Sequence, residues 1–292
     1  MWTILRQTFR EWQEDKVPVL ASSLAYYTVF SLAPLLLIAI AVAGLVFDRA
    51  QAQERILAEL GGLVGQQGRE LIASMLEGAS RHGSGWWAGL VGVLTLVLGA
   101  SGVFLQLQQA LNTVWDAQPR QRGGVSALVR ARLAALGMVL GLGFLVLVSL
   151  IASAALSALG TWAFAGAPGS KFLWQLVSFF FSFLVITLVF ALLYKYVPDV
   201  PVTWRDVWIG AIVTALLFNL GKFLIGQYLG HSATASTFGA AGALVILLLW
   251  IYYSAQIILL GAEFTQVYAH QRGSRAKAPQ PEPAPGGPPA GP

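Results

Sequence analysis

Apolar residues dominate six long stretches of this chain, and short polar segments separate them. A bilayer crossing takes about 20 apolar residues in a helix. The pattern therefore predicts six membrane-spanning helices, at approximately residues 20–47, 86–115, 133–163, 172–197, 207–229 and 239–262. We expect an all-α polytopic membrane protein whose transmembrane domain covers residues 17–270.

The first 16 residues have a different pattern. Trp2, Leu5, Phe9 and Trp12 recur at helical spacing among charged residues, which is typical of an amphipathic helix lying on membrane headgroups. A simple extension of the first spanning helix accounts for the spacing equally well.

Two further segments fall outside the predicted spans. In residues 48–85, apolar positions recur with a period of 3.6, which predicts two short amphipathic helices interrupted near Gly61, Gly62 and Gly65. We expect this insertion to rest on the membrane or to cap the bundle. Residues 273–292 are rich in proline, alanine and glycine, and we expect a disordered tail.

Composition and charge support a membrane protein with a defined orientation. The chain is 57% hydrophobic and 11% charged, whereas about a quarter of the residues in soluble domains are charged. Twelve lysines and arginines fall on one side of the six-helix arrangement and five on the other. Positive residues favour the cytoplasmic side, so both termini are expected there. The net charge of +5 is scattered between apolar runs, which argues against a nucleic-acid partner.

Polar residues inside the predicted spans collect at one depth, near the cytoplasmic side. Polar groups are costly in hydrocarbon and tend to face the bundle or a water-filled cavity. Pro34 follows the polar half of the first span and is expected to kink it. We predict a cavity open to the cytoplasm and closed near this proline, with a substrate path along Ser23, Tyr27, Ser31, Pro34, Gln108, Asn112, Tyr252, Gln256 and Glu263.

A second interpretation gives the polar residues of the spans structural roles and requires no cavity. Serine, glutamine and asparagine often form hydrogen bonds between membrane helices, and tyrosines near helix ends often anchor at the interface. The tyrosines to which the second role applies are Tyr194, Tyr196 and Tyr253.

Two ionisable side chains of the spans have alternative roles as well. Glu263 lies at the level of Lys195, so an ion pair between them is an alternative to a cavity role. Lys222 lies deep in the fifth span; it either extends to the outer headgroups or contacts a substrate or lipid headgroup together with Asn219.

Four stretches resemble successive signatures of one family. They are "ASSLAYYTVFSLAPLLL", "GASGVFLQLQQALNTVW", "LLYKYVPDVPVTWRDVWIGAIVTALLF" and "TFGAAGALVILLLWIYYSAQIILLGAEFTQVY". In this order they resemble the BrkB/YihY family of bacterial inner-membrane proteins, formerly mislabelled as ribonuclease BN. The resemblance implies a six-helix protein of the bacterial inner membrane and supplies no catalytic residues. Phe238 precedes Gly239 here, where the family often has tyrosine.

The residues themselves argue against an enzyme. The chain has no cysteine, and its three histidines, His82, His231 and His270, are far apart in sequence and have no carboxylate pair near them. Metal-dependent phosphodiester hydrolysis needs clustered ligands, so we expect no nuclease activity, metal site or cofactor. Two functions remain. The first is a transporter, exporter or lipid translocator acting on a substrate that the sequence does not identify, with membrane lipids as partners. The second is a non-transporting membrane scaffold or envelope-assembly factor.

Overall fold

The described part of the chain is helical. The computed structural model describes residues 2–44, 48–80, 86–117, 137, 141, 170–231 and 234–275. Within these residues there are seven helices: α1 (Trp2–Glu14), α2 (Val17–Ala43), α3 (Arg49–Ser80), α4 (Trp86–Val114), α6 (Ser170–Tyr196), α7 (Trp204–His231) and α8 (Thr234–Gln271). The predicted third span, 133–163, lies outside the described residues apart from positions 137 and 141, as does the tail beyond residue 275.

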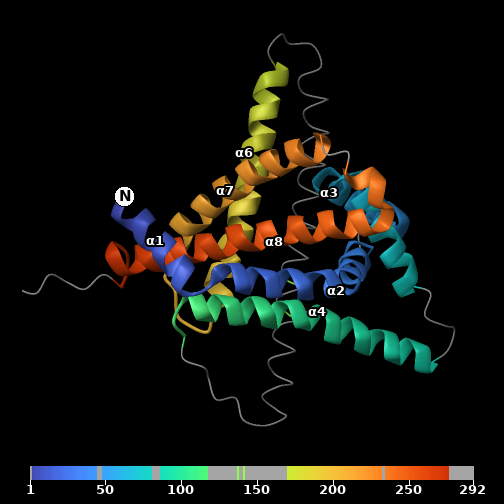
Figure 1. Cartoon of the computed structure of the whole chain (residues 1–292), viewed down its shortest axis with the longest axis horizontal. Helices are drawn as coiled ribbons and strands as arrows, with labels where there is room; N and C mark the ends of the chain where they lie inside the picture. Colours follow the sequence, from blue (N-terminus) through green and yellow to red (C-terminus); the bar gives the residue numbers. More distant parts are fainter. Residues whose placement is uncertain are drawn as a thin grey trace, which may run out of the picture.

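The long helices form a bundle in which neighbours in space are not always neighbours in sequence. Helix α2 packs between α4 and α8, and α7 packs between α8 and α6. The order across the bundle is therefore α4, α2, α8, α7, α6, with α6 steeply inclined to the others (Figure 1). Helix α8, the last described helix, thus lies at the centre of this order, with α2 and α7 on either side of it.

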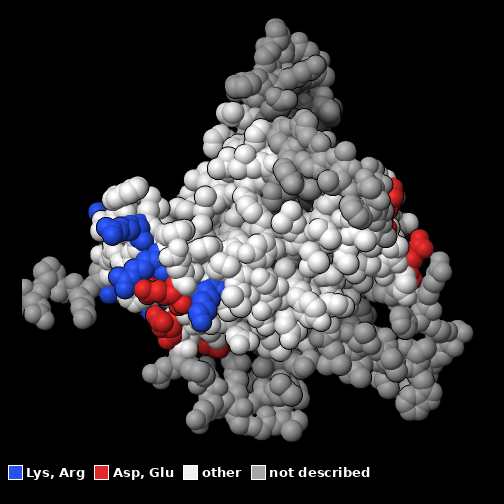
Figure 2. Space-filling view, in the orientation of Figure 1, with Lys and Arg blue, Asp and Glu red and all other residues white. Residues whose placement is uncertain are grey.

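Four of the described helices contain a segment long and apolar enough to cross a membrane. By length and apolar composition, these segments are Val17–Ala41, Leu176–Tyr196, Trp204–Leu224 and Ala241–Gln271. They confirm the first, fourth, fifth and sixth predicted spans. Helix α4 coincides with the second predicted span, 86–115. The described face carries its charged side chains at the two ends of the long axis, with an uncharged band between them, as expected of a bundle crossing a bilayer (Figure 2).

A reciprocal pair of contacts joins α7 to α8. Gly210 of α7 lies directly against Thr265 of α8, and Gly261 of α8 lies against Thr214 of α7. Each threonine hydroxyl donates to the carbonyl oxygen of the glycine one turn before it, Thr214 to Gly210 at 2.8 Å and Thr265 to Gly261 at 2.6 Å. The polar hydroxyls are thus satisfied within their own helices, and the glycines allow the two backbones to approach closely.

Helix α3 is interrupted as the sequence predicts. Its backbone leaves helical geometry at Gly65, where φ is 78° and ψ is 175°, a region that is essentially restricted to glycine. Arg69, beyond the kink, forms an ion pair with Glu54 before it. The kinked helix packs on α2, α7 and α8, with Leu57 and Ile72 buried in a shared apolar cluster. It caps the bundle.

Helix α1 is separate from the first span. It ends at Glu14, and the backbone turns at Lys16, where φ is 52°. The alternative of a continuous extension of the first span is therefore wrong. Ile4 on one face of α1 is buried against Phe264 and Val267 of α8. The opposite face exposes three of the four apolar residues expected on headgroups, Trp2, Leu5 and Phe9.

Candidate functional site

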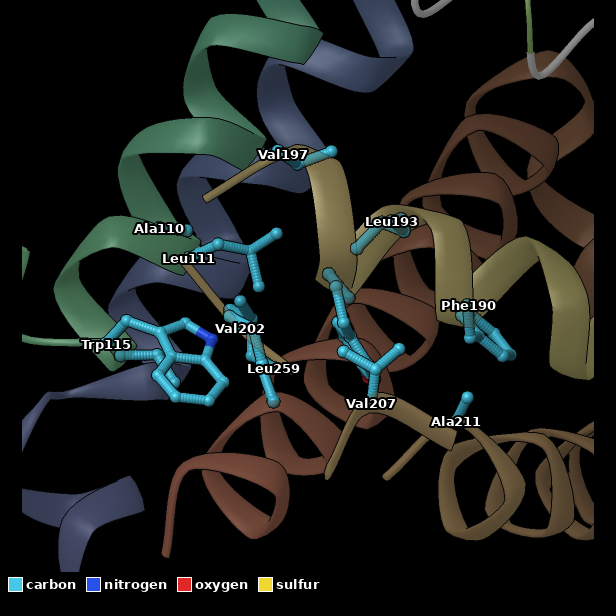
Figure 3. Packing of buried hydrophobic residues seen from close by; sticks show 14 of the residues in the cluster. Ala110, Leu111, Trp115, Phe190, Leu193, Val197, Val202, Val207, Ala211 and Leu259 are labelled. Atoms are coloured by element: carbon cyan, nitrogen blue, oxygen red, sulfur yellow. The ribbon is translucent and has the colours of Figure 1, made fainter. Parts of the chain in front are cut away.

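Half of the predicted site residues lie at one end of the bundle, which we call the α1 end. Here α1, the last turns of α4 and α8, and the loop between α6 and α7 meet around a buried apolar cluster. Figure 3 shows this cluster, in which Leu111 of α4 and Trp115, just beyond the end of α4, face Val202 of the loop and Leu259 of α8. Polar side chains surround this core in separate groups.

The first group joins α4 to the α6–α7 loop. Asn112 Nδ2 donates to Asp199 Oδ2 at 2.8 Å, and the backbone N–H of Asp199 donates to Asn112 Oδ1 at 2.8 Å. Gln108 Nε2, one turn earlier on α4, lies 3.4 Å from Asp199 Oδ1. The two predicted amide residues therefore share one partner, a loop carboxylate. We call this group the Asn112–Asp199 clamp.

A second group joins α1 to α8. Trp12 Nε1 donates to Gln256 Oε1 at 3.2 Å, and Gln256 Nε2 donates to the Tyr252 hydroxyl at 2.7 Å. Trp12 is thus held against α8 by this hydrogen bond, and its ring also stacks on that of the exposed Phe9, with 5.4 Å between the ring centroids.

The third group is acidic. Glu263 is 0% exposed, and neither of its carboxyl oxygens has a hydrogen-bond donor. The carboxyl group of Asp15, in the turn between α1 and α2, lies within hydrogen-bonding reach of it. Two carboxyl groups form a hydrogen bond only when one of them carries a proton. Burial raises the pKa of Asp15, and the carboxylate of Asp116 at the end of α4 raises it further.

The ion pair considered between Lys195 and Glu263 is wrong. The Lys195 ammonium donates to the carbonyl oxygen of Val202 and lies over the Trp204 ring, 5.8 Å from its centroid. A cation that has both a carbonyl acceptor and an aromatic face is held at the loop, so it does not reach Glu263.

Tyr194 is not an interfacial anchor. Its side chain is fully buried, and its hydroxyl donates to the Ile258 carbonyl at 2.7 Å and lies 2.9 Å from Thr214 Oγ1. This hydroxyl connects α6, α7 and α8. Tyr196, by contrast, is exposed at the end of α6, as an anchor would be.

The predicted residues of α2 lie along its contact with α4. Ser31 Oγ donates to the Gly99 carbonyl at 2.6 Å. Pro34 packs against Gly99, and the Tyr27 ring lies beside Gly102. Ser23 Oγ donates to the Val19 carbonyl of its own helix at 3.2 Å. The structure thus brings Ser31 and Pro34 together at Gly99, whereas Gln108 and Asn112 face the loop.

The remaining two predicted residues lie on α7. Asn219 Nδ2 donates to the Ala215 carbonyl of the same helix at 2.8 Å. Lys222 is exposed on the helix surface near the end of the spanning segment. Neither is part of the α1 end.

Sequence reasoning missed three contributors to the α1 end. Asp199 stands between Pro198 and Pro201, and this pairing of prolines predicts a non-helical loop whose aspartate is available as a partner. Asp15 is adjacent to Lys16 in the turn that ends α1. Thr214 had no signal of its own, because its role depends on the approach of α8.

Taken together, these features define a polytopic α-helical membrane protein with polar contacts concentrated at one end of the bundle. The chain belongs to the virulence factor BrkB family, whose profile matches residues 8–285. This confirms the family resemblance found in the sequence motifs.

Similar curated proteins carry the name UPF0761 membrane protein. The protein from Verminephrobacter eiseniae is 33% identical over 267 residues, which cover 90% of this chain and 62% of the relative. The protein from Tolumonas auensis is 30% identical over 263 residues, which cover 88% of this chain and 82% of the relative. The chain thus spans less than two thirds of the length of the first of these proteins. No solved structure matches it.

Proposed function

We propose that this protein is a transporter of the bacterial inner membrane that moves an amphiphile of the lipid class, with the α1 end in the cytoplasm. One observation carries the proposal. Tyr26 and Tyr27 are 59% and 44% exposed on the membrane-spanning part of α2, and no hydrogen bond to either hydroxyl is formed within the described residues.

The depth of these tyrosines argues against interfacial anchoring. Tyr27 lies ten residues beyond Val17, the start of the spanning segment, or about 15 Å along the helix. The hydrocarbon core is about 30 Å thick, so both phenols lie near its middle. Anchoring tyrosines occupy the headgroup level. A pair of phenol hydroxyls at mid-depth is suited to a polar headgroup in transit.

Other hydroxyls on α2 need no such explanation. Ser22 and Thr28 donate to carbonyl oxygens of their own helix, at 2.7 Å in both cases. A tyrosine hydroxyl is too far from its own backbone for this bond. A second polar group lies about one turn beyond the tyrosines. It is the Phe30 carbonyl, which lacks its helical hydrogen bond because Pro34 has no N–H to donate. The polar groups therefore continue along α2 toward Pro34.

Contacts at the α1 end fit an entrance in this proposal. The cytoplasmic cavity predicted from the sequence would open beside the Asn112–Asp199 clamp and the Trp12–Gln256 contact. Opening it requires breaking hydrogen bonds between elements. Such bonds are worth about 0.6 kcal/mol each between membrane helices, and about 1.5–3 kcal/mol where one partner is charged, as in the clamp. The transport step itself requires no covalent chemistry.

Reconstitution into vesicles tests the proposal. The rate at which a fluorescent phospholipid crosses to the other leaflet would be measured for the wild-type protein and for a variant carrying Tyr26→Phe and Tyr27→Phe. This variant keeps both rings and removes only the hydroxyls, so we expect a several-fold lower rate. Tyr196→Phe, an exposed tyrosine at the end of α6, is the matched control and should leave the rate unchanged.

A scaffold is the second candidate, and a different observation favours it. Gln108, Asn112, Tyr252 and Gln256 are all engaged in hydrogen bonds that join two elements or support such a bond. Polar residues serving only to hold helices together would give this arrangement. Wild-type vesicles with no more lipid transfer than empty vesicles would overturn lipid translocation and leave the scaffold.

A further inference from the structure

The carboxyl group of Glu263 is enclosed between helices without a donor. It projects from α8 beneath the α1–α2 turn, is 0% exposed, and has both oxygens unpartnered. An ionised carboxylate in such a position is strongly disfavoured, since burial without hydrogen bonds penalises the charged form. A second orphan group lies in the same core, because the Trp115 indole N–H is buried without an acceptor.

The charged groups that act most strongly on this carboxyl are acidic. Asp15 faces it directly, and Glu11 of α1 and Asp116 at the end of α4 add to the negative field. The basic groups nearby are engaged elsewhere. Arg10 pairs with Glu14 at 2.7 Å, and Arg275 donates to the Pro201 carbonyl at 3.0 Å and lies over the Trp115 ring. Lys195 is held by the Val202 carbonyl and the Trp204 ring. The side chains of Arg6, Lys16, Arg205 and Arg272 are exposed.

Two carboxyl groups within hydrogen-bonding reach of each other are strongly disfavoured from both carrying a negative charge. Two facing carboxyl groups share one proton, as is general for carboxyl pairs. A metal ion is the other way to neutralise such a pair, but the described residues contain no group of three or more acidic or histidine ligands arranged to hold one. A proton needs only the two carboxyl oxygens that face each other.

We infer that Asp15 and Glu263 form a proton-binding site, and that the bound proton holds the α1–α2 turn against α8. Release of the proton places two negative charges across this contact and pushes the turn away from α8. The Trp12–Gln256 hydrogen bond and the Ile4 contact with α8 lie in the same interface. The pH on the α1 side of the membrane would therefore set how firmly α1 is attached. The inference stands on this geometry and does not require that the protein transports lipid.

Infrared spectroscopy of the purified protein tests the bound proton directly. The carbonyl stretch of a protonated carboxyl group should be present near neutral pH, disappear at alkaline pH, and be absent from Glu263→Gln. Glu59→Gln, an exposed glutamate of α3, should leave the band in place. If the wild-type protein shows no band that Glu263→Gln removes, the site does not hold a proton. Loss of the band on adding sodium at constant pH would assign the site to a metal cation and would also overturn the inference.

Cross-linking tests the effect on α1. The chain contains no cysteine, so Gln7→Cys and Gln271→Cys create a single pair, at two side chains that are hydrogen-bonded across α1 and α8. At each pH, the rate of disulfide formation in the wild-type background would be divided by the rate for the same pair in the Glu263→Gln background. This ratio cancels the pH dependence of thiol chemistry. We expect the ratio to fall at least several-fold as pH rises. A ratio independent of pH would show that the proton does not control the contact.

Discussion

Asn112 and Asp199 bind each other in both directions. The Asn112 amide donates to the Asp199 carboxylate at 2.8 Å and accepts the Asp199 backbone N–H at 2.8 Å. The bond spans 87 positions of sequence and attaches the α6–α7 loop to α4. A two-way bond fixes the orientation of the loop, whereas a single bond would allow it to pivot.

Replacing Asn112 by leucine should therefore lower stability. The change removes two hydrogen bonds, one of them to a charged group, and such bonds contribute about 1.5–3 kcal/mol. We expect a lower midpoint of thermal unfolding in detergent at a fixed scan rate. Gln109→Leu is the matched control, because this neighbouring amide is exposed on the same helix.

Asn112→Asp separates the hydrogen bonds from side-chain volume. This variant retains the acceptor for the Asp199 N–H but places a carboxylate against a carboxylate. We therefore expect its unfolding midpoint to fall further than that of Asn112→Leu at neutral pH and to recover in acid. A midpoint for Asn112→Leu equal to that of Gln109→Leu would show that the clamp contributes nothing to stability.

A methyl group at Gly261 should disrupt the packing of α7 on α8. A Cβ there would collide with Thr214 Oγ1 and would lie 2.6 Å from the Tyr194 hydroxyl. Overpacking of this kind costs about 1–3 kcal/mol. We expect Gly261→Ala to lower the unfolding midpoint. Combining it with Thr214→Ala should restore part of the loss, which a double-mutant cycle would measure as favourable coupling; strictly additive effects would contradict the contact.

In α3, two nearby glycines should respond oppositely to alanine. Gly65 has φ of 78°, where a side chain costs roughly 1–2 kcal/mol, so Gly65→Ala should destabilise the protein. Gly62 is helical and a Cβ there meets nothing within 4 Å. Gly62→Ala should stabilise by about 0.5–1 kcal/mol. Thermal unfolding of both variants checks the kink, and equal shifts in the same direction would contradict it.

Periodicity made the helices and the α3 interruption predictable. Long apolar runs can satisfy their backbone only as helices in a bilayer, and the glycines at 61, 62 and 65 marked the kink. The depth of polar residues was predictable for the same reason, since depth follows from position along a helix.

Partners of the polar residues were not predictable in this way. Asn112 and Gln108 share a face of α4, but only the tertiary fold places Asp199 of a distant loop on that face. Tyr194 was expected at the interface because it is near a helix end, and instead α7 and α8 cover it. Lys195 donates to the Val202 carbonyl because the α6–α7 loop turns back past the end of α6. The path of a loop cannot be predicted from helical spacing.

Asp15 should make stability fall as pH rises. Its pKa is raised above the ordinary value of 3.8 in the folded protein, chiefly by burial. Above that ordinary value the unfolded chain releases the proton while the folded protein retains it, so the folded state binds more protons and its stability decreases with pH until the raised pKa is passed.

Asp15→Asn cannot lose a proton and can donate to Glu263. We expect this variant to unfold at a higher temperature than wild type at neutral pH, with the difference shrinking toward pH 4. Asp48→Asn, at the cap of α3, is the control: asparagine caps a helix about as well as aspartate, so we expect little change in the unfolding temperature. A constant difference between Asp15→Asn and wild type across this range would show that Asp15 titrates equally in the folded and unfolded protein.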